Sequence, residues 1–72
     1  MNKVTAKQLQ VGMKIYVKNC PHLGLDGGRT KPQGCELLEV LSIRVNGNSY
    51  YAMTELGECI GRSGNGKFLV AG

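Results

Sequence analysis

The sequence predicts an all-β protein, a small five-stranded antiparallel barrel with a short N-terminal helical turn. Three observations lead to this expectation: apolar and polar residues alternate from Val11 onwards, Asn46-Gly47 is a strong hairpin signal, and glycine-rich turns separate the short apolar segments that follow. A chain of 72 residues has room for one domain, which we expect to span residues 1–72. Closure of these short strands into a barrel would remove their exposed edges.

The N-terminal segment carries the signals of a short helical turn. Thr5 and Gln8 have the spacing of a capping box, in which each side chain bonds the backbone N–H of the other residue. Val4 and Leu9 occupy the two positions of a hydrophobic staple, which fixes the entry of the chain into the helix. Gly12 is expected to end the helical segment early.

The first strand is predicted over residues 11–18. Its apolar residues fall on one face of an extended chain, and they are Val11, Met13, Ile15 and Val17. The opposite face carries Lys14, Tyr16 and Lys18. This pattern predicts a half-buried strand with a basic outer face.

Residues 19–34 follow neither the helical nor the strand period, and they contain both prolines of the chain. Structureless loops longer than about 12–15 residues are uncommon in compact domains and are usually functional or disordered. We therefore expect this segment to connect the first two strands and to form the main recognition loop.

The remaining strands are predicted from apolar runs and turn residues. Adjacent apolar pairs within residues 35–45 predict a long strand that bends to serve two sheet surfaces. A two-residue turn at Asn46-Gly47 would place Ile43 opposite Tyr50. Gly57 is expected to turn the chain into a short strand over residues 58–61, and the glycine-rich residues 63–66 lead into a last strand over residues 67–70.

One short motif resembles a known family. Residues 9–15, LQVGMKI, are similar to the Leu-x-Val-Gly-Asp-x-Ile opening of many small barrels, with Met13 at the position where aspartate is common. Together with the order of loop, hairpin and short strands, the layout resembles the Src-homology-three-like barrel. The resemblance implies a fold class and no particular function, and in that class the loop after the first strand often lines the ligand groove. Small phage and mobile-element accessory proteins are often built this way.

The net charge of +4 is unevenly distributed. Residues 1–34 carry six lysines and arginines against Asp26 alone, whereas residues 35–60 carry Arg44 against four glutamates. This asymmetry favours an anionic partner for the first third of the chain. A solubilising surface charge is an equally good interpretation.

The sequence also predicts the compartment. The N-terminal residues lack the apolar segment of a signal peptide, and no stretch reaches the roughly 18–20 apolar residues of a membrane span. An odd number of cysteines, three, fits a reducing environment. We therefore expect a cytoplasmic protein with no membrane partner.

Residues 61–67, GRSGNGK, match the glycine and lysine positions of a nucleotide-binding P-loop. That motif requires Ser or Thr after the lysine and a following helix, but Phe68 follows here and only four residues remain. We therefore expect a plain glycine-rich turn. The alternative is a nest of backbone amides that contacts a phosphate of a nucleic acid together with Arg62 and Lys67.

Four side chains are candidate metal ligands, and they are Cys20, His22, Cys35 and Cys59. Their spacing lacks the two close pairs that zinc sites usually have, so we expect neither metal nor cofactor, and we expect Cys35 and Cys59 to be small buried residues. A disulfide between Cys20 and Cys35 is disfavoured in a reducing compartment. A Cys20–His22 catalytic pair lacks a third group to orient the base, so no enzyme is expected.

The expected function is therefore binding, and two classes of partner remain open. The first is nucleic acid, contacted by Lys14, Lys18, Arg29, Lys31, Arg62 and Lys67, with Tyr16 stacking on a base. The second is a host protein, in an inhibitor-like or scaffold role, with Leu23 and Leu25 as exposed apolar anchors in the 19–34 loop. A small-molecule substrate is not expected.

Overall fold

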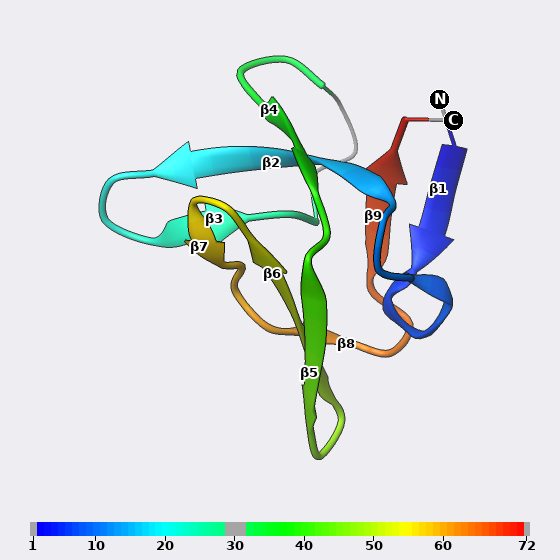
Figure 1. Ribbon diagram of the computed structural model, residues 1–72. Coiled ribbons are helices and arrows are strands. Elements are labelled where there is room, and N and C mark those ends of the chain that lie inside the picture. The colour runs from blue at the N-terminus through cyan, green and yellow to red at the C-terminus, as the bar shows by residue number, and fades with distance from the viewer. Residues whose placement is uncertain (1, 29–31, 72) are drawn as a thin grey trace.

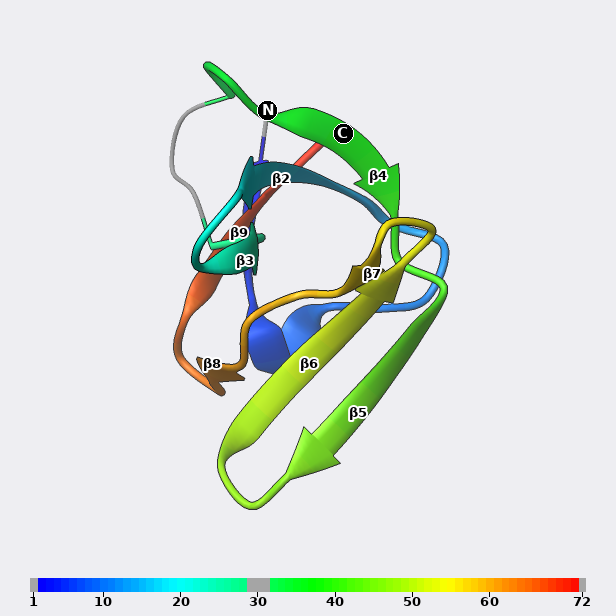
Figure 2. The ribbon, with the colours of Figure 1, turned by 90° about the vertical axis from the view of Figure 1, so that its left-hand side faces the viewer.

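The computed structural model describes residues 2–28 and 32–71, and it confirms that the chain is all-β. The strands form two antiparallel sheets rather than a closed barrel (Figures 1 and 2). The first sheet holds β1 (Asn2–Thr5), β2 (Lys14–Cys20), β3 (Gly24–Asp26), β4 (Glu36–Glu39) and β9 (Lys67–Val70). The second holds β5 (Ser42–Asn46), β6 (Ser49–Thr54), β7 (Gly57–Glu58) and β8 (Arg62–Ser63). No helix of the described chain is long and apolar enough to cross a membrane.

The predicted helical turn is present as one turn of 3₁₀ helix, η1 (Ala6–Gln8). The Thr5 backbone N–H donates to Gln8 Oε1 at 3.0 Å, which is the reciprocal bond of a capping box. Leu9 is buried and Val4 packs against the core, as the staple positions predicted. The sequence did not predict β1, which precedes this turn and pairs along its whole length with β9.

The first predicted strand begins later and ends later than expected. Val11 is 62% exposed and lies before β2, because Gly12 has a φ of +97° and turns the chain just before the strand begins. Ile15 and Val17 are buried as predicted, so Lys14, Tyr16 and Lys18 take the opposite face. The first half of β2 pairs with β4, and its last three residues pair with β3.

The prediction of a structureless loop over residues 19–34 is wrong in its first half. β2 continues to Cys20 and turns back through Pro21–Leu23 into β3, with Cys20 opposite Gly24 and Lys18 opposite Asp26. Gly24 has a φ of +96°, a conformation that glycine adopts without strain and that starts the returning strand. A strand of three residues is too short to show a period of two in the sequence. Arg29, Thr30 and Lys31 lie outside the described residues.

The prediction that residues 35–45 bend between two surfaces is confirmed. The chain leaves the first sheet after β4 and enters the second sheet at β5, with Val40 and Leu41 at the crossing. The Val40 N–H donates to the Met13 carbonyl at 2.8 Å, and the Leu41 N–H donates to the Met53 carbonyl at 2.8 Å. Two consecutive amides therefore bond to different sheets.

The predicted hairpin between β5 and β6 forms, but its register is shifted by one residue at the turn. Asn46 pairs with Ser49, so Gly47 and Asn48 are the central turn residues and Ile43 lies opposite Ala52 rather than Tyr50. Gly47 has a φ of +62°, whereas no described residue other than glycine has a positive φ. This combination of signs belongs to a type II′ turn, with glycine first, and not to the type I′ turn that the Asn-Gly pair predicted.

The last third of the chain does not form the predicted meander. β7 and β8 both pair with β6, and between them the Ile60 N–H donates to the Leu25 carbonyl at 2.8 Å, which joins β3 to this segment. β9 then returns to the first sheet beside β1. Side chains from both sheets form one apolar core, whose buried members include Ile15, Val17, Leu25, Leu38, Val40, Ala52, Cys59, Phe68 and Val70.

One glycine has no space for a side chain because of this core. A Cβ atom added at Gly27 would lie 2.9 Å from Phe68 Cε2 and 3.4 Å from Ile15 Cδ1, and both of these side chains are fully buried. We expect Gly27→Ala to lower the free energy of unfolding by about 1–3 kcal/mol, as overpacked cores do. Urea denaturation measures the change, with Gly64→Ala as a control because its nearest atoms belong to the exposed Lys7 side chain. Equal stability of the two variants would contradict this packing.

Candidate functional site

The basic outer face that the sequence predicted for the first strand is present on β2. Lys14, Tyr16 and Lys18 alternate with the buried Ile15 and Val17, so all three point away from the core. Successive side chains on one face of a strand are about 6.6–6.8 Å apart, which places Tyr16 midway between the two lysines. These three predicted contact residues are therefore brought together.

Neighbouring strands extend this face around Tyr16. Tyr16 lies opposite Leu37 of β4, whose side chain is exposed. On the other side, Ile15 pairs with Val70 of β9, so continuing this register by one residue places Leu69 beside Tyr16. Leu69 is buried, yet it does not belong to the main core cluster.

Two more lysines share the outward face of the first sheet. Lys67 alternates with the buried Phe68 along β9, and Lys3 lies opposite Leu69 on β1. Lys67 precedes Val70 by three residues, so it lies about 10 Å along β9 from the contact with β2. The sequence pattern missed Lys3 because β1 has no alternation that distinguishes it from a disordered end. We call Lys3, Lys14, Tyr16, Lys18 and Lys67 the lysine face.

Acidic residues lie opposite the two lysines of β2. Glu39 of β4 is directly across from Lys14, and Asp26 of β3 is directly across from Lys18. The carboxylate of Asp26 is already engaged, because Arg62 Nη2 donates to its Oδ1 at 2.8 Å and the Gly28 N–H donates to the same atom at 3.0 Å. The carboxylate that lies opposite Lys18 is therefore also bound by the second sheet, through Arg62.

The prediction that Arg62 contacts phosphate as part of the basic face is not supported by its position. Arg62 lies on β8 of the second sheet, and its guanidinium is half-buried in the ion pair with Asp26. Gly28 accommodates this arrangement, because an added Cβ atom there would overlap the Arg62 guanidinium. Arg62 thus ties β8 to the end of β3. The predicted contacts at Arg29 and Lys31 lie outside the described residues.

The glycine-rich segment 61–67 connects the second sheet to the first. Within the described residues no helix follows it, and neither Gly64 nor Gly66 has a positive φ. The Gly66 N–H instead donates to the Ser63 carbonyl at 2.9 Å, closing a turn between β8 and β9. The segment therefore forms the glycine-rich turn that the sequence predicted.

The adjacent tyrosines of β6 point to opposite sides, as a strand requires. Tyr50 packs against the core, and Tyr51 lies outward beneath the Arg44 guanidinium, 4.1 Å from its ring centroid. Arg44 also donates to both carboxylate oxygens of Glu58, at 3.0 Å and 2.9 Å. The hydrogen bonds from Arg44 lower the pKa of the Glu58 carboxyl. The outer face of the second sheet thus satisfies its own charges.

The structure does not bring the four candidate metal ligands together. Cys59 is buried between the sheets, His22 is exposed on the turn before β3, and Cys20 and Cys35 are half-buried on other segments. In residues 2–28 and 32–71, no group of three or more His, Cys, Asp and Glu side chains is close enough to hold a metal ion. Cys59 instead fills core space as a small apolar residue, as the sequence predicted.

Burial also determines the reactivity of Cys59. Desolvation, followed by the nearby charges of Asp26 and Glu58, raises the pKa of its thiol from 9.0 to about 11. The thiolate is the nucleophile, so we expect Cys59 to resist alkylation by iodoacetamide at pH 8 while Cys20 and Cys35 react. The pKa of this thiol is higher in the folded state than in the unfolded state. The free energy of unfolding should therefore fall as the pH rises from about 9 towards 11. Mass spectrometry of alkylated peptides measures the reactivity, and rapid labelling of Cys59 would contradict the packing.

The two leucines predicted as protein anchors have different environments. Leu23 is 75% exposed at the turn between β2 and β3, but Leu25 is 7% exposed and belongs to the core, so its prediction as a surface anchor is wrong. Two other exposed apolar side chains flank β3, and sequence reasoning missed both. Ile60 Cγ1 lies 3.8 Å from the Cβ position of Gly24, and Leu56 precedes Gly57, whose Cβ position is 3.8 Å from Leu25 Cδ1.

Comparisons with protein-family models, with curated proteins and with solved structures find no match for this chain.

Proposed function

We propose that this protein is a binding module without catalytic activity, and that it contacts single-stranded nucleic acid through the lysine face. The observation that supports this proposal is the gathering of four lysines from three strands on one side of the first sheet, with Tyr16 among them. Lysine ammonium groups bind phosphates without reading sequence, and an aromatic ring stacks on any base. Such a surface binds a strand by charge and stacking.

A single strand fits this face better than a duplex for a geometric reason. Stacking on Tyr16 requires a base that is not already stacked and paired in a duplex. The described part of the chain offers no helix longer than η1, so no recognition helix is present there to enter a major groove. Leu37, which lies opposite Tyr16 and is exposed, adds apolar surface on which a base ring can lie.

The test of this proposal is binding of a short fluorescein-labelled oligothymidylate, followed by fluorescence anisotropy. Binding that weakens steeply with salt and depends on Lys14 and Lys18 would support the proposal. Absence of binding at low salt would remove it.

A second candidate function is contact with a host protein, as in an inhibitor or scaffold. The observation that favours it is the exposed apolar group of Leu23, Leu56 and Ile60 around β3, which replaces the predicted pair of Leu23 and Leu25. This group lies at the turn between β2 and β3 and beside β7, away from the strand pairs that carry Lys3 and Lys67. Variants at Leu23 and variants at the lysine face therefore distinguish the two partners.

We also propose that the fold is related to the Src-homology-three-like barrel. It is supported by a β2 strand that pairs with β4 at one end and β3 at the other, and by a chain that crosses between the sheets at Val40 and Leu41. An experimental structure that shows the strand order of a different small β fold would contradict it.

A further inference from the structure

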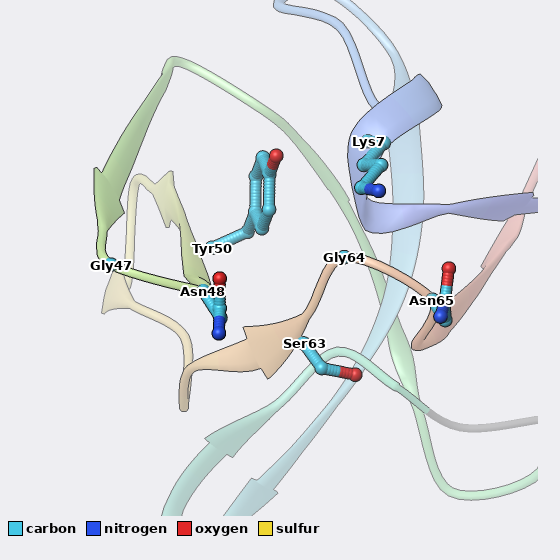
Figure 3. A pocket seen from close by; sticks show the side chains of 7 residues that line it. All are labelled: Lys7, Gly47, Asn48, Tyr50, Ser63, Gly64 and Asn65. Carbon is cyan, nitrogen blue, oxygen red and sulfur yellow. The ribbon is translucent and has the colours of Figure 1, made fainter.

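A cavity of about 290 Å³ lies between three segments that are distant in the sequence. They are η1, the turn between β5 and β6, and the connection between β8 and β9 (Figure 3). The residues that line it are Lys7, Gly47, Asn48, Tyr50, Ser63, Gly64 and Asn65. None of them belongs to the lysine face, so this cavity is a separate feature of the molecule.

Lys7 is held against one wall of the cavity by contacts with the β8–β9 connection. The Lys7 N–H donates to the Gly64 carbonyl at 3.3 Å, and the neighbouring Ala6 N–H donates to the Gly66 carbonyl at 2.8 Å. The aliphatic part of Lys7 lies over Gly64, because an added Cβ atom there would be 2.6 Å from Lys7 Cε and 3.1 Å from Lys7 Cγ. Gly64 therefore provides the space that places this ammonium group at the cavity.

Tyr50 supplies an aromatic ring on the facing wall. Its side chain extends from β6 towards η1, and Figure 3 shows its ring and Lys7 on opposite sides of an opening, with Gly64 below. The side chain of Ser63 points away from Tyr50 in the same view. Tyr50 is half-buried and packs against the core, so its ring is fixed before any ligand arrives.

The chemistry of these walls defines the ligand. Lys7 is the one charged residue among the described residues that line the cavity, and its ammonium group favours a ligand with a negative charge. A fixed aromatic ring across from that charge favours a flat ring system that stacks on it. The volume lies just below the range of about 300–1,000 Å³ for ligand pockets, so a small ligand fits best.

We propose that this cavity binds one nucleoside phosphate unit, with its base on the Tyr50 ring and its phosphate on the Lys7 ammonium group. The unit is either a free nucleotide or one nucleotide of a single strand. If the unit is one nucleotide of a single strand, the proposal rests on the proposed function. If it is a free nucleotide, the proposal does not. A free mononucleotide tests the cavity independently of the lysine face.

The experiment is a titration of ¹⁵N-labelled protein with adenosine 5′-monophosphate, monitored by the amide signals of Asn48, Gly64 and Asn65. We expect saturable shifts at these amides, and weaker binding of ribose 5-phosphate, which has the phosphate but no base. Tyr50→Leu, which keeps an apolar side chain, should weaken binding by roughly 5- to 100-fold through loss of stacking. Lys7→Met, which keeps the aliphatic chain over Gly64, should weaken it by about tenfold.

Two further variants separate positioning from general charge effects. Gly64→Ala should displace the Lys7 side chain and weaken binding of adenosine 5′-monophosphate while the protein stays folded. Arg44→Gln removes a positive charge that lies outside both the cavity and the lysine face, and it should leave this binding unchanged. Equal affinity for ribose 5-phosphate and adenosine 5′-monophosphate, or equal losses in Lys7→Met and Arg44→Gln, would overturn the proposal.

Oligothymidylate distinguishes failure of this proposal from failure of the proposed function. If the mononucleotide does not shift the cavity amides while the oligonucleotide binds through Lys14 and Lys18, the cavity proposal is wrong and the lysine face stands. If the mononucleotide binds through Lys7 and Tyr50 while no oligonucleotide binds, the cavity is a free-nucleotide site and the proposed function is wrong.

Discussion

Replacing Leu25 by aspartate is expected to abolish cooperative folding. Leu25 lies in the middle of β3, is 7% exposed and belongs to the core cluster, and its carbonyl accepts the Ile60 N–H that joins the two sheets. An unpaired carboxylate at this position is costly to bury, because no described cation is directed into the core to neutralise it. A domain of this size has a narrow margin of stability, so the variant should show no thermal unfolding transition by circular dichroism.

The matched control is Leu23→Asp, two residues earlier. Leu23 is 75% exposed, so this variant should unfold within a few degrees of the wild-type melting temperature. Leu25→Ala gives an intermediate case, with an expected loss of about 2–5 kcal/mol. If Leu23→Asp were as destabilising as Leu25→Asp, the assignment of the β2–β3 turn to the surface would be wrong.

This pair of leucines shows why the sequence reveals only part of the fold. Leu23 and Leu25 both precede a glycine or an acid in a segment rich in turn residues, and their local sequences do not separate them. Leu25 contacts residues 59–60, which lie more than thirty positions later in the chain, whereas Leu23 remains exposed. Alternation predicts which face of a long strand is buried, but a three-residue strand is determined by its distant partner.

The sequence likewise predicts only part of the lysine face. Lys14, Tyr16 and Lys18 follow from the alternation along one strand, and the structure confirms that they share a face. Arg62 and Lys67 looked equivalent in the glycine-rich segment, yet Arg62 pairs with Asp26 while Lys67 joins the outward face of β9. The pairing of β9 with both β1 and β2 decides this difference, and no local pattern encodes it.

The second large effect is expected from neutralising the two lysines of β2. In the double variant Lys14→Gln/Lys18→Gln, two phosphate contacts are lost while the alternation of the strand is preserved. Each lost contact with a single strand lowers the magnitude of the slope of log Kobs against log salt by about 0.7, so the double variant should lose about 1.4 from that slope. Its affinity for oligothymidylate at about 50 mM salt should fall at least tenfold.

Two control variants test whether the effect comes from the positions of these two lysines or from net charge. Lys14→Arg/Lys18→Arg keeps both charges, so it should retain the wild-type slope. Arg44→Gln removes a positive charge from the outer face of the second sheet, where Arg44 is bound to Glu58, and it should change the slope little. Loss of binding in Arg44→Gln equal to that in the double variant would mean that net charge, and not the lysine face, determines affinity.

The central claim is that a single strand binds across the lysine face, and the most direct test is the salt dependence of oligothymidylate binding by the unmodified protein. With four lysines on this face, we expect log Kobs to fall linearly with log salt with a slope of about −2 to −3, and we expect the double variant at Lys14 and Lys18 to halve it. No measurable binding at low salt, or a slope that the double variant leaves unchanged, would contradict the claim.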